Sequence, residues 1–357
     1  MAGKYLLTKK AIPLLKLNYQ THKIFITLSF LCIFSNFALK AQDPHFSQFY
    51  AAPLYINPAF TGSAPEGRFT FNYRAQWPKL PGEFFTYQAG YEHNFQRANS
   101  SLGVMAILDQ AGSAGIRSTN IHISYAYDLT LDKEWALKAG LQIGYGSRGL
   151  DYYKLVFGDQ LSSIGSNGNP TQDPSAENLN INYIDASSGF VLYSENFWLG
   201  ISGHHLNQPN QSFTLTDEKL PMQISVQTGY KIPFYKYNKS KNDDPSASLT
   251  PSLYYSQQGK FKQLDVGLNG FLDPVIAGIW YRGVPIQKSY NGAVVLMTGF
   301  KYKYLRFLYS FDTAVGKFST VTGGAHEISM SLTTGSLQRK KKYRRNKKSP
   351  DFPSFVE

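Results

Sequence analysis

The sequence predicts an all-β protein, a transmembrane antiparallel β-barrel of about 14 strands. Aromatic residues make up 15% of the 357 residues, yet the mean hydropathy is slightly negative at -0.30. After residue 41 the apolar runs reach only about ten residues, whereas a membrane-spanning helix needs about 20. Strands that are apolar on one face, with aromatic girdles at two membrane interfaces, account for both observations.

Alternation of side chains between two faces is the main evidence for strands after residue 67. In the stretch 134–147 small and polar residues suited to a lumen alternate with an aromatic-ended apolar row suited to lipid. A soluble β-sandwich also alternates, but its strands average about five or six residues, and here rows of about ten repeat. The lipid-facing row of this stretch is Trp135, Leu137, Ala139, Leu141, Ile143 and Tyr145.

Fourteen candidate strands can be placed, an even number as a closed single-chain barrel requires. If the N-terminus is periplasmic, the long connection 147–181 lies outside and the tight turns at 194–195, 272–273 and 301–302 lie inside. The long turn 232–246 is an exception to this rule. The candidate strands are 68–77, 84–93, 101–109, 118–129, 134–147, 182–193, 196–205, 220–231, 247–256, 260–271, 274–282, 291–300, 303–312 and 324–334.

Residues 1–41 have the features of a secretory signal peptide, with cleavage expected after Ala41. Five lysines and no acid precede the apolar stretch 24–37, and small residues follow it. The alternative, a membrane anchor, needs about 20 apolar residues, and this stretch is shorter and interrupted by polar residues. The single cysteine, Cys32, lies in the stretch, so the exported protein is expected to contain no disulfide, cysteine nucleophile or thiolate metal site.

The formal charge of +12 is confined to the two ends of the chain. Residues 1–41 carry six bases and no acid, while residues 339–357 carry eight bases and two acids. The body between them is neutral, so a basic pI does not indicate nucleic-acid binding here. The basic tail at 336–357 has two interpretations: a solvated extension, or a docking arm for an acidic periplasmic partner or membrane surface, with Arg344 and Arg345 as candidate contacts.

The residue pattern gives little support for catalysis, a cofactor or a metal. His204 and His205 are adjacent on a predicted strand, so their side chains are expected on opposite faces, unable to share an ion. His122 and Ser124 share a face with Asn120 and Asp128, as in an outer-membrane hydrolase, but an ordinary hydrated lumen row explains them better. Phosphate-loop, HExxH and GxSxG motifs are absent from the sequence.

The segment 42–67 is apolar but cannot be a barrel strand, because prolines interrupt it. Its aromatic density predicts that it packs at or inside the periplasmic mouth of the barrel, 68–335, where it plugs the lumen or contacts a partner. A loose tail would leave that surface in water. The candidate residues are Phe46, Phe49, Tyr50, Leu54, Tyr55, Asn57, Pro58 and Phe60.

The same segment carries a resemblance to a known family. Residues 42–62, QDPHFSQFYAAPLYINPAFTG, resemble the start of mature PorP/SprF proteins. Later blocks are similar in order and spacing, and the likeness extends to about Leu332; the tail beyond departs from the family pattern. These blocks are YRAQWP at 73–78, INYIDASSGFVLYSENFWLGISGHHLNQP at 181–209, YYSQQGKFKQLDVGLN at 254–269, WYRG at 280–283 and YSFDTAVG at 309–316.

The resemblance implies a non-enzymatic outer-membrane component of the type IX secretion and gliding machinery. The expected partners are outer-membrane lipid and either periplasmic machine subunits, a lipoprotein and ring proteins, or a secreted adhesin with a type B C-terminal signal. Two alternatives from other classes stay open: a passive or lipophilic-solute channel, and an outer-membrane hydrolase. Bilayer conductance would favour the channel, and serine-probe labelling would favour the hydrolase.

Overall fold

The computed structural model describes residues 43–163, 165–173, 179–213, 217–235, 247–283, 292–315, 322–334, 350 and 352–353. These residues belong to one compact unit, Gln42–Glu357. The expected leader at 1–41 and the basic residues Arg344 and Arg345 lie outside the described residues.

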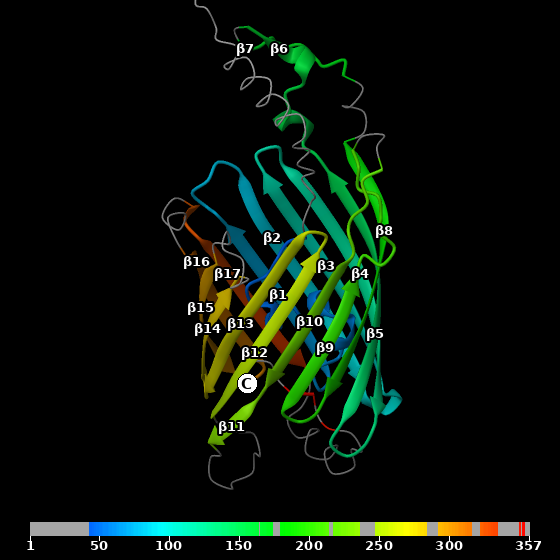
Figure 1. The fold of residues 1–357 in the computed structure, drawn as a ribbon, viewed down its shortest axis with the longest axis vertical. Coiled ribbons are helices and arrows are strands. Elements are labelled where there is room, and N and C mark those ends of the chain that lie inside the picture. Colours follow the sequence, from blue (N-terminus) through cyan, green and yellow to red (C-terminus); the bar gives the residue numbers. More distant parts are fainter. Residues whose placement is uncertain are drawn as a thin grey trace, which may run out of the picture. The chain divides into compact units, whose positions relative to one another are not determined.

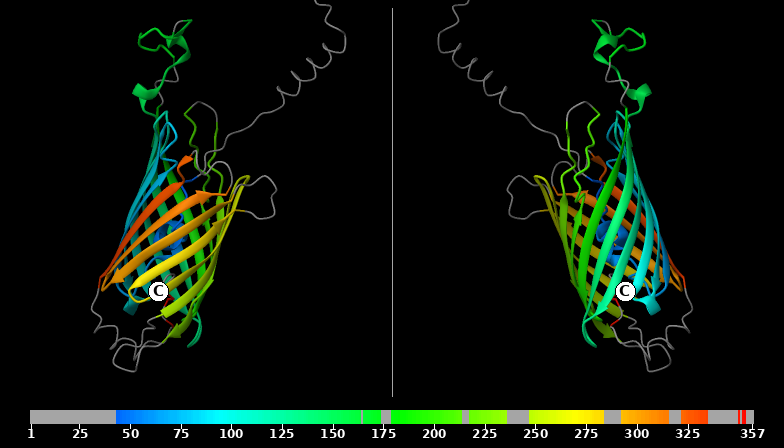
Figure 2. Two further views of the ribbon diagram at one scale, coloured as in Figure 1. Left: turned by 90° about the vertical axis from the view of Figure 1, so that its left-hand side faces the viewer. Right: turned by 90° about the vertical axis from the view of Figure 1, so that its right-hand side faces the viewer.

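Antiparallel strands pair in chain order, and pairing of the first with the last closes the barrel (Figures 1 and 2). The sheet has 15 named strands in the described chain, but two of them pair in succession with the same neighbour and form one barrel strand. The predicted count of fourteen barrel strands is therefore confirmed. The strands are β1 (Gly67–Gln76), β2 (Glu83–Phe95), β3 (Ser100–Gly112), β4 (Ile116–Thr130), β5 (Ala136–Gly149), β8 (Asn180–Tyr193), β9 (Phe197–His204), β10 (Gln223–Tyr230) continued by β11 (Ile232–Tyr235), β12 (Ala247–Gln258), β13 (Phe261–Leu272), β14 (Val275–Arg282), β15 (Ala293–Tyr302), β16 (Leu305–Ala314) and β17 (Ala325–Thr334).

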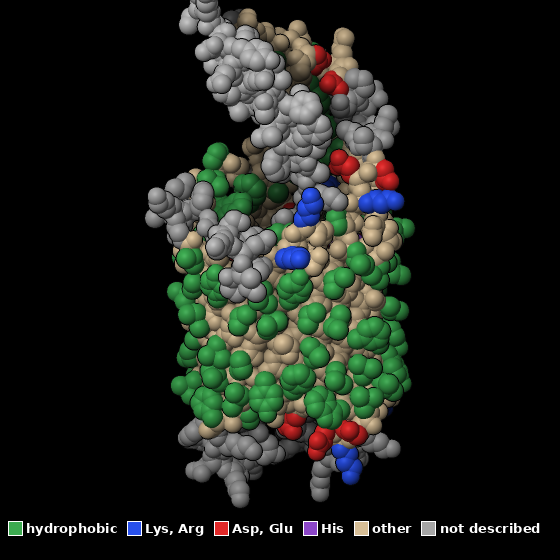
Figure 3. All heavy atoms as spheres, in the orientation of Figure 1, with side chains coloured by type: hydrophobic (Ala, Val, Ile, Leu, Met, Phe, Trp, Pro, Cys, Tyr) green, Lys and Arg blue, Asp and Glu red, His purple; other side chains and the backbone are tan. Residues whose placement is uncertain are grey.

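The predicted division of each strand into two faces is confirmed. In β5, Leu141 and Ile143 are 63% and 66% exposed, whereas Lys138 and Gln142 are 1% and 3% exposed. On the face that Figure 3 shows, exposed apolar side chains form a belt across the barrel, with charged side chains beyond it at both ends. Period-two alternation thus separates a wall suited to lipid from a polar lumen.

The two ends of the barrel differ in their connections. At one end, which we call the turn end, the strands are joined tightly, for example at 194–196, 273–274 and 303–304. At the other, the loop end, β5 and β8 are joined by a long connection (Figure 1). The turn expected at 232–246 begins later, because its first residues form β11, and 236–246 lie outside the described residues. The long connection contains η4 (Tyr152–Lys154), η5 (Gly158–Gln160), β6 (Leu161–Ser162) and β7 (Gly165–Ser166).

The described helices are all short, and none is long and apolar enough to cross a membrane. One of them, η3 (Gln96–Ala98), lies in the turn between β2 and β3. Two more, η4 and η5, lie in the long connection, and the remaining three precede β1, within residues 43–66, which we call the luminal segment. It forms η1 (Phe49–Ala51), α2 (Pro53–Ile56) and η2 (Pro58–Phe60).

The luminal segment lies inside the barrel (Figure 2). It starts near the loop end, where Asp43 contacts Gln258 at the last residue of β12, and reaches the turn end, where β1 begins. Prolines open α2 and η2, a position where the missing N–H costs nothing. The sequence placed this segment at or inside one mouth; folded into three short helical turns, it extends along the lumen instead.

Candidate functional site

The candidate site is the filled lumen, where the luminal segment meets the barrel wall. The predicted residues are brought together there: Phe46, Leu54 and Phe60 are at most 2% exposed, and Asn57 is fully buried. Tyr55 is half-buried and packs on the same core. Partners could reach these side chains only if the segment moved. Also buried are Phe49, Tyr50 and Pro58.

An aromatic cluster joins the segment to the wall formed by β12, β14 and β15. The ring of Phe49 stacks on Tyr254 at 5.0 Å between centroids and meets Trp280 edge-on at 4.9 Å. Tyr50 stacks on Trp280 at 5.6 Å, and its hydroxyl lies 2.7 Å from Met297 Sδ. Aromatic pairs of this kind contribute about 0.5–1.5 kcal/mol each beyond burial, so the cluster is a strong apolar anchor.

A buried charge network holds the segment on the side of β1, β16 and β17. Glu327 accepts hydrogen bonds from the backbone N–H groups of Ser47 at 2.7 Å and Gln48 at 2.9 Å. Arg74 pairs with Asp312 at 3.0 Å and with Glu327 at 3.1 Å, and Arg282 also pairs with Asp312, at 3.0 Å. Buried charges are tolerated only when paired and hydrogen-bonded, as they are here.

Two histidines near the loop end are in opposite charge states. Burial and the nearby Arg282 guanidinium lower the pKa of His45, so its imidazole is neutral at neutral pH, 3.3 Å from Asp265. Burial also lowers the pKa of His205, but the charge of Asp43 and hydrogen bonds with Asp185 and Asp43 outweigh it and raise the pKa to about 10. His205 is therefore an imidazolium between two carboxylates.

The predicted opposite orientation of His204 and His205 is wrong. His204 is the last residue of β9 and lies 3.0 Å from the carbonyl oxygen of Ile56 in the luminal segment. His205 follows the strand with a left-handed φ of 55°, which turns its side chain toward Asp185 and Asp43, at 2.8 and 2.6 Å. Strand alternation no longer applies at that residue, and both histidines contact lumen groups.

On the side of β5, β8 and β9, the luminal segment packs directly on the backbone of the barrel wall. Gly140 of β5 and Gly189 of β8 are register partners, and a Cβ on Gly140 would overlap the backbone of Pro58 and Ala59. Asn57 fits over the second glycine and donates to the carbonyl oxygen of Ile201 at 3.2 Å. The missing side chains of the two glycines make room for the segment.

At the turn end the segment is held by its last residues. The N–H of Gly62 donates to Glu92 at 2.8 Å, and its carbonyl oxygen accepts from Lys138 at 3.2 Å. Ser124 faces the lumen together with His122, as predicted, and its hydroxyl lies 2.9 Å from that of Thr61. The serine is thus engaged by the luminal segment. Across the described residues, no group of three or more His, Cys, Asp or Glu side chains is placed to hold a metal ion.

Sequence reasoning missed the charged wall residues, namely Arg74, Asp265, Arg282, Asp312 and Glu327. A signal was present, because Arg74 and Asp312 alternate with aromatic residues in 68–77 and 303–312, and a charge that faces a lumen needs a partner. The partners could not be assigned, since Arg74 and Asp312 are 238 residues apart.

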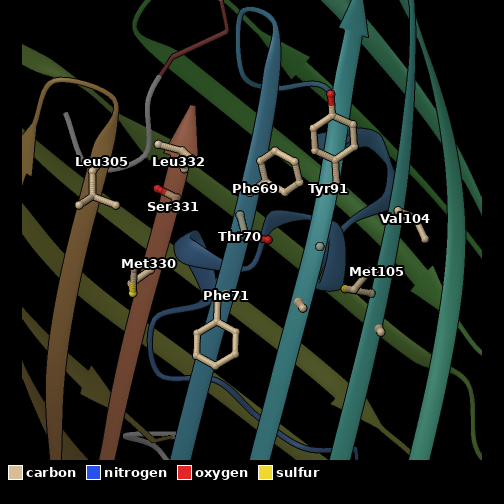
Figure 4. A pocket seen from close by; sticks show the side chains of 13 residues that line it. Phe69, Thr70, Phe71, Tyr91, Val104, Met105, Leu305, Met330, Ser331 and Leu332 are labelled. Atoms are coloured by element: carbon tan, nitrogen blue, oxygen red, sulfur yellow. The ribbon is translucent and has the colours of Figure 1, made fainter. Parts of the chain in front are cut away.

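A second hollow, of about 470 Å³, lies on the outside of the wall across β1, β2, β3, β16 and β17 (Figure 4). The wall is thin there because Ala89, Gly90 and Ala106 carry little or no side chain. The rim is apolar, with Phe69, Phe71, Leu305 and Met330 labelled in the figure. It opens on the surface expected to meet lipid.

A closed barrel with an apolar outer belt and a polar lumen defines the class of outer-membrane β-barrel proteins. The model of type IX secretion system membrane proteins, PorP/SprF, matches residues 38–332. The chain belongs to the PorP/SprF family. No curated protein matches this sequence.

Similar solved structures have low sequence identity. The Acinetobacter baumannii outer membrane protein Omp33 is 9% identical, with a TM-score of 0.42, over 75% of this chain and 99% of that one. The P. putida toluene transporter TodX is 9% identical, with a TM-score of 0.45, over 78% and 93%. The CymD monoaromatic hydrocarbon channel is 11% identical, with a TM-score of 0.44, over 80% and 93%. These likenesses carry no functional argument.

Proposed function

We propose that this outer-membrane protein is a non-enzymatic, plugged scaffold of the type IX secretion machinery. It binds periplasmic machine subunits, or supports export and surface attachment of one adhesin with a type B C-terminal signal, and does not pass solutes through its lumen. The observation that carries the proposal is the luminal segment, which is anchored to opposite sides of the barrel wall. Residues 1–41 direct export in this proposal and are cleaved from the exported protein.

Closure of the lumen is what separates this proposal from the channel alternative. The segment runs from Asp43, at the level of the last residue of β12, to the start of β1, so it spans the lumen lengthwise. Its anchors include charged, aromatic and close-packed contacts on different strands. Solute passage would require many of these to break together, which favours a scaffold over an open pore.

The candidate residues of the luminal segment then act indirectly. Because Phe49 and its neighbours are buried, they contribute to partner binding by fixing the luminal segment and the turn-end mouth beside it. The turn end carries both the last residues of the segment and the end of β17. We place the periplasmic partners at this end, since tight connections of outer-membrane barrels normally face the periplasm.

A double variant tests the role of the segment. Phe49→Ser with Tyr55→Ser removes apolar anchors, and the expected result is a heat-modifiable, folded barrel that no longer supports secretion and loses its co-purifying subunits. The matched control, Phe49→Leu with Tyr55→Phe, keeps the lumen filled and should secrete normally. Full secretion by the serine variant would contradict the proposal.

Conductance in planar bilayers tests closure directly. The intact protein should stay closed, while a variant lacking residues 46–60 should open frequent ionic currents, because the aromatic and charged anchors are gone. Heat-modifiable migration must show that the deletion variant is still a barrel. Steady porin-like conductance of the intact protein would favour the channel alternative.

A further inference from the structure

A C-terminal residue lies in the turn-end mouth, far along the chain from everything it touches. The ring of Phe352 meets Phe60 of the luminal segment edge-on, at 5.7 Å between centroids, and lies 4.9 Å from Tyr193 of β8. Phe352 packs on the hydrophobic core cluster that includes both residues, and the next residue, Pro353, is buried. The sequence had assigned this tail only to solvent or to charge-mediated docking.

The two residues that Phe352 contacts, which we call the cradle, are themselves held in place. Phe60 and Tyr193 are 2% and 4% exposed. The Tyr193 hydroxyl donates to Asp128 at 2.9 Å, and Asp128 pairs with Lys138 at 3.2 Å. Lys138 in turn donates to the carbonyl oxygen of Gly62, at 3.2 Å. Both sides of the cradle therefore connect to the luminal segment.

We propose that Phe60 and Tyr193 form a docking site for an aromatic residue followed by proline, and that the occupant is the chain's own Phe352–Pro353. The docked pair is an intramolecular lid over the part of the turn-end mouth between Phe60 and Tyr193, and it braces the end of the luminal segment. The interaction is apolar, so it is insensitive to salt. Docking of the basic residues by charge would weaken as salt screens it beyond about 3 Å at 1 M. The docked position of Phe352 and Pro353 does not depend on which partner the protein binds.

Photo-crosslinking tests the occupant on the full-length purified protein. With p-benzoylphenylalanine in place of Phe352, irradiation should link that position to peptides containing Phe60 or Tyr193. The yield should be equal at about 0.1 M and about 1 M NaCl, between which the electrostatic screening length falls from about 10 Å to about 3 Å. The matched control carries the same photo-reactive residue in place of Tyr153, which is 95% exposed in the long connection. It should give no such link. Absence of the link from position 352, or links only to other proteins, would overturn the lid.

Hydrogen exchange tests the bracing. Phe352→Ala should accelerate exchange of the backbone amides of residues 59–62 by about two- to tenfold, the range expected from losing an aromatic pair. Phe352→Tyr keeps the ring and should leave exchange unchanged. Phe69→Ala, on the outer face of β1, is the control for a lost aromatic elsewhere. Unchanged exchange in Phe352→Ala means that the tail does not brace the segment, and the proposal fails.

Discussion

The two sides of the barrel wall hold one segment by different physical means. On the side of β5 and β8, Gly140 and Gly189 leave a bare patch on which the backbone of Pro58 and Ala59 and the side chain of Asn57 rest. On the side of β1, β16 and β17, carboxylates and guanidinium groups receive the segment. The first side depends on shape and the second on charge.

The difference shows which side can exist without the segment. The wall charges pair with one another, Arg74 with Asp312 and Glu327 and Arg282 with Asp312, while the segment contributes neutral N–H and hydroxyl groups. This side therefore keeps ion pairs of its own when the segment is absent, although Glu327 then loses two backbone N–H donors. At Gly140 and Gly189 the wall offers the segment bare backbone, and removing the segment leaves an unfilled hollow there. Charge therefore stabilises the barrel, whereas shape specifies the plug.

The largest effect is expected on the charged side, from Arg74→Leu. It removes the cation that Asp312 and Glu327 share, and breaking a buried pair costs about 3–5 kcal/mol because a charge is left uncompensated. The temperature at which the folded band disappears on gels should fall clearly. Arg117→Leu, an exposed arginine at the loop-end start of β4, is the control. If both variants lose equal stability, the network is not what holds this side together.

A smaller effect is expected on the glycine side, from Gly140→Val. The new side chain meets the backbone of Pro58 and Ala59, and overpacking costs about 1–3 kcal/mol. Because the wall itself tolerates valine, the barrel should stay folded while the segment shifts, seen as faster hydrogen exchange at residues 57–62. Ala139→Val, the outward-facing neighbour, should be silent. Faster exchange in both variants would mean that the glycine does not act through the segment.

The sequence predicted what depends on local periodicity. Alternation placed Leu141 outside and Gln142 inside, and the fourteen-strand count survives even where the pairing between β11 and β12 is irregular after Pro233. Proline lacks the N–H that a ladder needs, which explains the irregularity. The aromatic density of residues 46–60 also predicted correctly that they need a packed environment.

What the sequence could not predict depends on contacts between distant residues or on single backbone angles. Arg74 and Glu327 are 253 residues apart, so only closure of the barrel brings them together. His205 was assigned to the wrong face because its left-handed φ ends the alternation one residue earlier than expected. The docked position of Phe352 likewise has no local signal. Each failure occurs where the folded lumen, and no strand by itself, sets the geometry.

The smallest effect on stability is expected from a third kind of contact, the titratable contact of His205 with Asp43 and Asp185. The raised pKa of His205, about 10, means that its contribution is fully present below its ordinary value near 6.5 and is lost as the pH rises through about 10. Burial raises the pKa of Asp43, but the His205 charge outweighs it and lowers the pKa. Its contribution is therefore present above the ordinary value near 3.8 and is lost as the pH falls through the lowered one. The contact is strongest between these limits.

Nuclear magnetic resonance of ¹³C-labelled histidine in detergent micelles should show a His205 signal, assigned with His205→Gln, that titrates near pH 10. Asp43→Asn should lower that midpoint, because the largest favourable charge is removed while Asp185 remains. Asp43→Asn should cost less than Arg74→Leu at neutral pH, because Asp185 still pairs with the imidazolium and the Asp43 side chain is 21% exposed. The temperature at which the folded band disappears on gels should be lower at about pH 10.5 than at about pH 8, because the pH then rises through the His205 pKa of about 10. This decrease should be larger for the wild type than for His205→Gln. A His205 midpoint near 6.5 would show that the imidazole is not held between the two carboxylates, and the loop end of the segment would then depend on shape and aromatic packing alone.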